Sequence, residues 1–141
     1  MGTRSGQQPG TSCCPLVHHL HAHLVFVTKS RREIFNGDML TRCEEIMRNV
    51  CHSFEAHLRE FNGEGDHVHL LVHYPPKIAL SKLVNPLTGV SSRYLHAQHT
   101  GRINRIGTGS VFWSPSYFAG SCGGAPLSTV QEYIENQKRP A

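Results

Sequence analysis

Hydrophobic and polar positions follow a regular pattern along most of this 141-residue chain, and the pattern predicts a domain of mixed α and β structure. Residues 18–28, 57–62 and 67–72 alternate or are rich in β-branched residues, and aromatic residues flank Ser-Pro-Ser in residues 111–118, so each segment predicts a strand. Apolar residues three and four apart predict helices over residues 39–54, 78–97 and 127–138. The order β-α-β-β-α-β-α predicts an α+β fold: a ferredoxin-like or RRM-like split βαβ antiparallel sheet with an appended C-terminal helix.

Glycine and proline mark the boundaries of these elements. Residues 1–15 are rich in Gly, Ser, Thr and Pro, which predicts a flexible N-terminal tail before a single domain at residues 16–141. Pro86 lies inside the second predicted helix and is expected to kink or interrupt it. Residues 101–109 predict a loop, and residues 120–124 predict a flexible connector before the last helix.

Two histidines stand one residue apart in the predicted strand that follows Gly65. Side chains alternate between the faces of a strand, so His67 and His69 should share one face, while the intervening apolar residues face the core. Two neighbouring imidazoles supply half of a metal site. The alternative is a half-exposed strand that merely carries two histidines.

The last predicted helix brings in a second candidate pair, Tyr133 and Gln137, which lie four residues apart and share a helical face. If this helix packs near the histidine strand, a divalent cation, Mg²⁺ or Mn²⁺, would be held by two imidazoles and the Gln137 amide oxygen beside the tyrosine. Such a site leaves positions open for phosphate oxygens and water. Asp66 could orient His67, or it could cap the turn. The alternative for the helix is a surface tyrosine over a solvated glutamine.

Composition and net charge indicate the kind of partner that the protein binds and the cellular compartment in which it works. The net charge is +4 and arginine outnumbers lysine, which favours a polyanionic partner. No apolar run is long enough to span a membrane. Five cysteines without C-x-x-C spacing argue against a disulfide framework and a cysteine zinc ribbon, so we expect a reducing cytoplasm.

Several residues are candidates for contact with nucleic acid. Arginine suits phosphate contacts, aromatic rings stack on unpaired bases, and histidines on the first strand would face the same surface. The candidates are Arg93, Arg102, Arg105, Trp113, Tyr117, His21 and His23. Solvated loops also carry arginine, and a lone tryptophan is more often part of a core.

Four stretches in order resemble the HUH single-strand tyrosine transposases of small bacterial insertion sequences (the TnpA type). They are GDHVHLLV at 65–72, LVN at 83–85 with GVSSR at 89–93, FWSPSY at 112–117 and YIENQ at 133–137. The resemblance covers about residues 18–138. It implies that His67 and His69 are the metal ligands. It also implies that Tyr133 is the nucleophile and Gln137 the third ligand.

The same resemblance implies a DNA transposase that cleaves and rejoins single-stranded DNA at hairpin-marked element ends through a 5′-phosphotyrosine intermediate. It further implies a homodimer with active sites shared between subunits, working at the nucleoid. A domesticated or replication-type HUH nickase would share this chemistry. A non-catalytic RNA-binding module of the same fold would instead carry aromatic pairs on its central strands, where this chain has histidines. A structural zinc protein would need four ligands, one more than we count.

Overall fold

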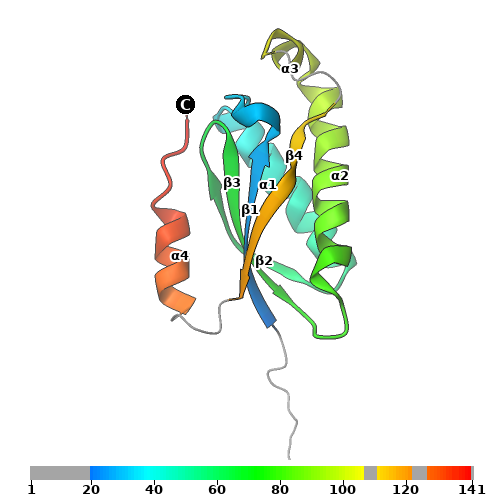
Figure 1. Ribbon diagram of the computed structural model, residues 1–141, viewed down its shortest axis with the longest axis vertical. Helices are drawn as coiled ribbons and strands as arrows, with labels where there is room; N and C mark the ends of the chain where they lie inside the picture. The colour runs from blue at the N-terminus through cyan, green and yellow to red at the C-terminus, as the bar shows by residue number, and fades with distance from the viewer. Residues whose placement is uncertain (1–19, 107–110, 122–126, 141) are drawn as a thin grey trace, which may run out of the picture.

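The computed structural model describes residues 20–106, 111–121 and 127–140, so the predicted N-terminal tail and most of the predicted connector lie outside the described residues. The elements in chain order are β1 (Leu20–Thr28), a short 3₁₀ helix η1 (Lys29–Arg31), α1 (Gly37–Ser53), β2 (His57–Gly63), β3 (His67–Tyr74), α2 (Leu80–Gln98), α3 (Thr100–Ile106), β4 (Trp113–Ser121) and α4 (Leu127–Glu135). The strands form one antiparallel sheet in the order β2-β3-β1-β4. The predicted α+β fold with an appended C-terminal helix is confirmed (Figure 1).

The two faces of the sheet are covered by different helices. The long helices α1 and α2 pack together on one side, and α4 lies against β2 and β3 on the other (Figure 1). Val68, Leu70 and Val72 are fully buried in the main hydrophobic core, as the alternation along β3 predicts. The intervening side chains of β3, including both histidines, therefore face α4.

Helix α1 begins and ends close to where the sequence predicts. Asn36 is its N-cap, and the Asn36 side-chain oxygen accepts a hydrogen bond from the Met39 N–H over 2.9 Å. The apolar stripe of the helix is buried, and it includes two free cysteines, Cys43 and Cys51. Burial raises the pKa of the Cys51 thiol to about 12, which makes this thiol unreactive at neutral pH.

Pro86 and Pro115 lie inside elements that continue past them, so the predicted interruption of the second helix is not observed. Helix α2 runs through Pro86 without a break, because buried Leu83 and Leu87 hold the helix to the core on either side of the proline. Strand β4 extends through Pro115, but its pairing with β1 is irregular there, with a register shift between the Phe26–Tyr117 and Thr28–Trp113 pairs. Since β4 is an edge strand, its proline need not donate to a ladder hydrogen bond.

The prediction of a loop from residue 101 is also wrong, because α3 occupies residues 100–106. This short helix is set by tertiary contacts: Ile103 is fully buried, and the Arg102 guanidinium donates to the Ile34 carbonyl oxygen over 2.5 Å. The last helix ends at Glu135, three residues before the predicted end. In the part of the chain that the structure describes, no helix is long and apolar enough to cross a membrane.

Candidate active site

A tight turn between β2 and β3 sets where the histidine strand begins. The Glu64 N–H donates to the His67 carbonyl oxygen over 2.9 Å. A Cβ atom on Gly63 would lie 2.5 Å from the same oxygen, so this close approach requires glycine. His67 and His69 then project from one face of the sheet, with ring centroids 5.0 Å apart.

The His67 ring is fixed by a carboxylate. Its Nδ1 lies 2.6 Å from Oδ1 of Asp66, and Arg31 Nε donates to Oδ2 of the same carboxylate over 3.2 Å. Burial alone would raise the pKa of Asp66, but the hydrogen bonds and charges of His67 and Arg31 hold it below its usual value. An ionised carboxylate only accepts hydrogen bonds, so Nδ1 of His67 is the donor to Asp66 and Nε2 is the ring nitrogen left for another partner. The orienting role for Asp66 anticipated from the sequence thus has a geometric basis.

Arg31 reaches Asp66 from an unusual turn, and its part in the site was missed by sequence reasoning. Ser30 and Arg31 have φ angles of 57° and 54°, in the left-handed region that residues other than glycine rarely adopt. Thr28 anchors the turn, since its N–H donates to the Asp66 carbonyl oxygen over 2.9 Å. The sequence showed only a basic turn after the first strand, without a signal for which side chain points toward the histidines.

His69 lies deeper than its neighbour and is 6% exposed. Burial, with smaller effects of His67 and His23, lowers the pKa of His69 to about 4. The ring is therefore neutral at neutral pH, which is the form that binds a metal. Nε2 of His23, on β1, lies 3.0 Å from Nδ1 of His69. Burial also lowers the pKa of His23.

Helix α4 places Tyr133 over this cluster. The Ile134 side chain is fully buried and anchors the helix, while Tyr133 is 52% exposed. The tyrosine ring lies 5.4 Å from the His69 ring and 6.0 Å from the His23 ring, measured between centroids. The sequence-based site required the last helix to pack near the histidine strand, and in this structure it packs there within one chain.

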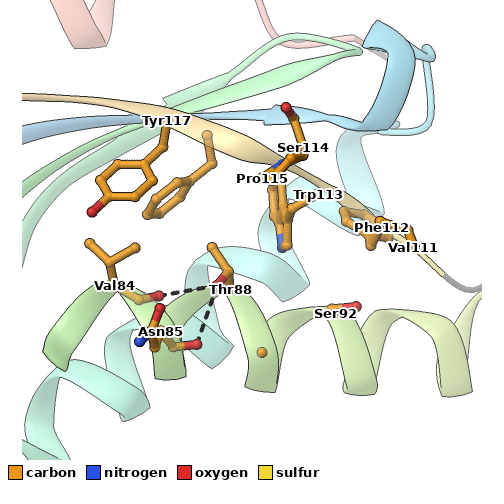
Figure 2. A pocket seen from close by; sticks show the side chains of 12 residues that line it. Val84, Asn85, Thr88, Ser92, Val111, Phe112, Trp113, Ser114, Pro115 and Tyr117 are labelled. Atoms are coloured by element: carbon orange, nitrogen blue, oxygen red, sulfur yellow. Dashed lines mark hydrogen bonds between the residues drawn. The ribbon is translucent and has the colours of Figure 1, made fainter. Parts of the chain in front are cut away.

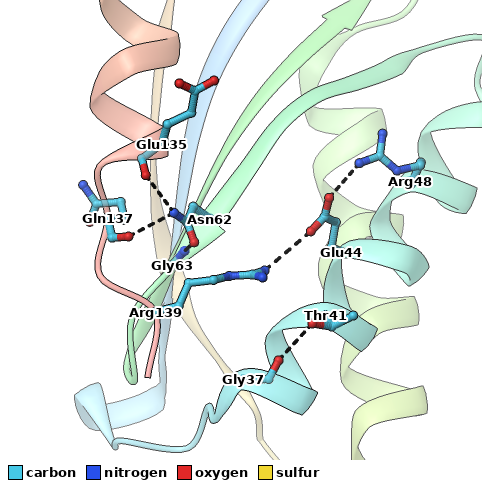
Figure 3. Close-up of polar contacts among 9 residues, drawn as sticks. All are labelled: Gly37, Thr41, Glu44, Arg48, Asn62, Gly63, Glu135, Gln137 and Arg139. Carbon is cyan, nitrogen blue, oxygen red and sulfur yellow. Dashed lines mark hydrogen bonds and ion pairs between the residues drawn. The ribbon is translucent and has the colours of Figure 1, made fainter. Parts of the chain in front are cut away.

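Asn62, on β2, holds the end of α4 and was not singled out from the sequence. Its side-chain amide donates to the carbonyl oxygens of Glu135 and Gln137, over 3.3 and 3.0 Å (Figure 3). Asn62 is the cross-strand neighbour of His69, so the residue that ends the helix also adjoins the cluster. A polar residue at the end of a strand carries no sequence signal for this role.

Gln137 is brought to the same side of the sheet but not into contact with the histidines. Its side-chain amide donates to the Tyr133 carbonyl oxygen over 3.3 Å. No hydrogen bond between described residues joins the Gln137 side chain to His67 or His69. Nor do the described residues include a group of three or more His, Cys, Asp and Glu that could hold a metal ion.

The donor set nevertheless fits a divalent metal in an open site. Both histidines have Nδ1 next to a protein partner, which leaves Nε2 for a ligand. Two neutral imidazoles with an amide oxygen suit a borderline cation such as Mn²⁺. The ligands would be His67 and His69, with Gln137 after a change of side-chain conformation.

The candidate nucleic-acid contacts are scattered. Trp113 is 7% exposed, and its indole N–H donates to the Ser91 hydroxyl over 3.0 Å, so the prediction that it stacks on bases is corrected to a core role. Arg102 is engaged with the Ile34 carbonyl oxygen. The Arg93 guanidinium lies 5.7 Å from the Tyr94 ring centroid.

The other three candidates differ in their surroundings. Arg105 is exposed on α3. Among the described residues, no hydrogen bond or ion pair joins it to the histidine cluster. His21 contacts His73, with ring centroids 3.7 Å apart. Tyr117 is 42% exposed at the mouth of a cleft.

This cleft, of about 410 Å³, opens between α2 and β4 (Figure 2). Asn85, Thr88 and Ser92 line it from the helix, while Trp113 and Tyr117 line it from the strand. It lies on the face covered by α1 and α2, so it is separated from the histidines by the sheet. The cleft therefore does not open onto the histidine cluster.

Comparison with known proteins agrees with the geometry. The family described as "Transposase IS200 like" matches residues 16–137. The transposase for insertion sequence element IS200 of Salmonella typhimurium is 30% identical over 115 residues, which are 82% of this chain and 74% of that protein.

Two solved structures share the fold. A transposase of Deinococcus radiodurans has a TM-score of 0.69 and 24% identity, over 99% of this chain and 100% of that chain. A REP-associated tyrosine transposase bound to a REP hairpin has a TM-score of 0.56 and 9% identity, over 84% of this chain and 64% of that chain. Since the family match spans nearly the whole described domain, the chain belongs to the IS200-like transposases.

Proposed function

We propose that this transposase cleaves and rejoins single-stranded DNA at hairpin-marked element ends, with Tyr133 as the nucleophile. The observation that carries the proposal is the position of the Tyr133 ring, 5.4 Å from the ring of His69 and on the face that holds both HUH histidines. A nucleophile beside two metal-type ligands suits metal-assisted cleavage of a phosphodiester.

In the proposed reaction, the Tyr133 hydroxyl oxygen attacks a backbone phosphorus and the bond from phosphorus to the 3′-oxygen breaks. The tyrosine loses its proton, and the departing 3′-oxygen gains one. The product is a 5′-phosphotyrosine, which keeps the phosphodiester energy so that another 3′-hydroxyl can reverse the step. A divalent metal, Mg²⁺ or Mn²⁺, held by His67, His69 and Gln137, would act as a Lewis acid on the scissile phosphate.

Charge and exposed side chains support a DNA strand as the substrate. The net charge of +4 favours a polyanion, but it is too small for affinity to come from counterion release alone. The exposed side chains of Arg93 and Arg105 would add contacts to the DNA backbone, and His21 lies near the cluster on β1. One of the two solved relatives by fold is bound to a hairpin, which supports a folded single strand.

We also propose that the protein works as a homodimer in which the tyrosine helix of one subunit serves the histidines of the other. The edge strand β4 supports the dimer, because its residue Phe118 is 56% exposed and an exposed strand edge favours pairing with a second copy. Helix α4 packs on its own sheet in the isolated chain. The proposal therefore requires that the helix can leave that position.

The proposed activity is tested with a hairpin-bearing single strand taken from the DNA flanking the gene, with Mn²⁺ present. We expect nicking of this strand and not of a blunt duplex of the same sequence. Tyr133→Phe should abolish nicking, while Tyr94→Phe, at an exposed tyrosine of α2, should not. Full activity of Tyr133→Phe, or equal cleavage of the duplex, would overturn the proposal.

Sharing of the sites is tested by mixing His67→Ala protein with Tyr133→Phe protein, each inactive alone. If the sites are shared, heterodimers contain one intact site and nicking returns. If each helix serves its own chain, both sites of the heterodimer stay defective. No recovery, with subunit exchange shown independently, would establish that the sites are built within one chain.

A further inference from the structure

The two proposed metal ligands are each held by a different kind of partner. Nδ1 of His67 lies 2.6 Å from the Asp66 carboxylate, whereas Nδ1 of His69 lies 3.0 Å from Nε2 of His23. In both rings the same nitrogen is therefore occupied by the protein. Only Nε2 of each ring is left for a ligand that arrives from solvent.

We propose that His23 is a positioning residue that fixes His69 in the tautomer with its proton on Nδ1, so that Nε2 presents its lone pair to the metal. The Nδ1–H of His69 donates to Nε2 of His23, which therefore carries its own proton on Nδ1. This inference rests on the proposed metal site, but its geometric part concerns the metal-free protein.

The sheet fixes this contact in place. In the pairing of β1 with β3, Val25 stands opposite His69 and His23 stands opposite Leu71, so the two histidines are diagonal neighbours on one face. Their ring planes differ by 24°, with centroids 5.3 Å apart. Two nearly coplanar rings side by side let the N–H of one point along the lone pair of the other.

Two aromatic rings hold His23 on its remaining sides. Phe118 on β4 meets it edge to face with centroids 5.8 Å apart, and Tyr133 on α4 does so at 6.0 Å. His23 thus contacts both the ligand and the nucleophile-bearing helix. A side chain held between three rings is placed as a structural support, in contrast to the DNA contact that the sequence predicted for His23.

The use of an imidazole here has a chemical consequence. Asp66 already supplies one negative charge to the cluster, with a lowered pKa. A second carboxylate at position 23 would orient His69 equally well but would repel the phosphate that must approach. A neutral acceptor fixes the tautomer without that repulsion.

The test uses three variants of the full chain. His23→Phe keeps a ring between Phe118 and Tyr133 but removes the acceptor. His23→Gln keeps an acceptor, because its amide oxygen reaches about as far as Nε2. His21→Phe is the matched control, on the same strand and face but in contact with His73 instead of His69.

Two measurements are made on each variant without DNA. Long-range ¹H–¹⁵N correlation spectra of the metal-free protein report which nitrogen of His69 carries the proton. Titration with Mn²⁺, followed by electron paramagnetic resonance, gives the affinity. We expect the Nδ1–H tautomer in the parent chain, a mixture of tautomers in His23→Phe and a loss of affinity of about tenfold. His23→Gln should recover most of both, and His21→Phe should match the parent.

The inference is overturned if His69 carries its proton on Nε2 in the parent chain. It is also overturned if His23→Phe changes neither the tautomer of His69 nor the Mn²⁺ affinity. A separate titration of His67→Ala judges the metal site itself. If that variant binds Mn²⁺ as tightly as the parent, the proposed function fails, while the tautomer spectra still decide the role of His23.

Discussion

The two faces of the sheet are built for different purposes. On one face, α1 and α2 cover a continuous apolar core in which Leu70 and its neighbours on β3 are fully buried. On the other face, α4 covers histidines, and it is held by the buried side chain of Ile134 and by the Asn62 amide at its end. The first face stabilises the domain, and the second assembles a polar cluster under a helix with few anchors.

This difference between the two faces indicates which contacts can change without unfolding the domain. An apolar core of close-packed side chains cannot rearrange without losing several kcal/mol per side chain. Within residues 129–135 of α4, whose side chains the structure describes, Ile134 is the one buried side chain, so releasing this helix breaks fewer such contacts. The histidines are therefore carried by a strand inside the sheet, whereas Tyr133 is carried by a helix with fewer buried contacts.

The largest expected effect is on activity at the histidine face. His67→Ala or His69→Ala should lower the nicking rate about a thousandfold, because the metal's contribution of several kcal/mol to the transition state is lost. The unfolding free energy should change little. The control is His52→Ala, at an exposed histidine of α1. Nicking assays and urea unfolding measure the two effects, and undiminished nicking by both variants would refute the metal site.

The next largest effect is expected on stability, where replacing two neighbouring leucines of β3 should lower the unfolding free energy by different amounts. Leu70 and Leu71 are both fully buried, but Leu70 belongs to the main core and Leu71 faces α4. Leu70→Ala should lower the unfolding free energy by about 2–5 kcal/mol. Leu71→Ala should fall at the low end of that range, because a loosely held helix can settle into the cavity. Equal losses in urea unfolding would mean that α4 is as firmly built in as α1 and α2.

A smaller effect is expected at the end of α4. Asn62→Ala removes both hydrogen bonds to the carbonyl oxygens of Glu135 and Gln137. Docking of the helix should weaken by about 1–3 kcal/mol. Hydrogen exchange of α4 amides should accelerate while β1 and β3 stay protected, and Asn49→Ala on α1 should leave exchange unchanged. Uniform acceleration across the domain would show that α4 is not a separate unit.

The smallest effect concerns two carboxyl groups between β2 and α4. Burial, and then the nearby Glu135 carboxyl, raise the pKa of Glu60. A carboxyl group with a raised pKa favours the docked helix below its ordinary pKa, and this advantage is lost as the pH rises through the raised value. Glu60→Gln should therefore slow α4 exchange at about pH 8 and have little effect at about pH 5. The same effect at both pH values would contradict the assignment.

The sequence was sufficient to predict which side chains are buried where apolar residues follow the period of a strand or a helix. The alternation around His67 placed the histidines opposite the core residues of β3, and the apolar stripe of α1 was buried as predicted. Local signals failed where tertiary contacts decided the outcome. Residues 100–106 form a helix where a loop was predicted, because Ile103 is buried in the core. Helix α2 continues past Pro86, because Leu83 and Leu87 on either side of the proline are buried.

The candidate site likewise contains residues that the sequence pattern identified and residues that only the tertiary structure revealed. The spacing of Tyr133 and the histidines identified residues that the fold brings within ring contact. Arg31, Asn62 and His23 entered the site only through turn geometry and cross-strand register, which a single sequence does not display. The sequence left two roles open for Trp113, stacking on bases and a position in the core. Its burial and its hydrogen bond to Ser91 assign it to the core.

The central claim is that Tyr133 becomes covalently joined to DNA at the histidine face. The most direct measurement stops a cleavage reaction in denaturant, digests the protein and locates the attached nucleotide by mass spectrometry. We expect a 5′-phosphate ester on Tyr133 in the parent chain and no adduct in Tyr133→Phe. An adduct on another residue, or nicking without any adduct, would contradict it.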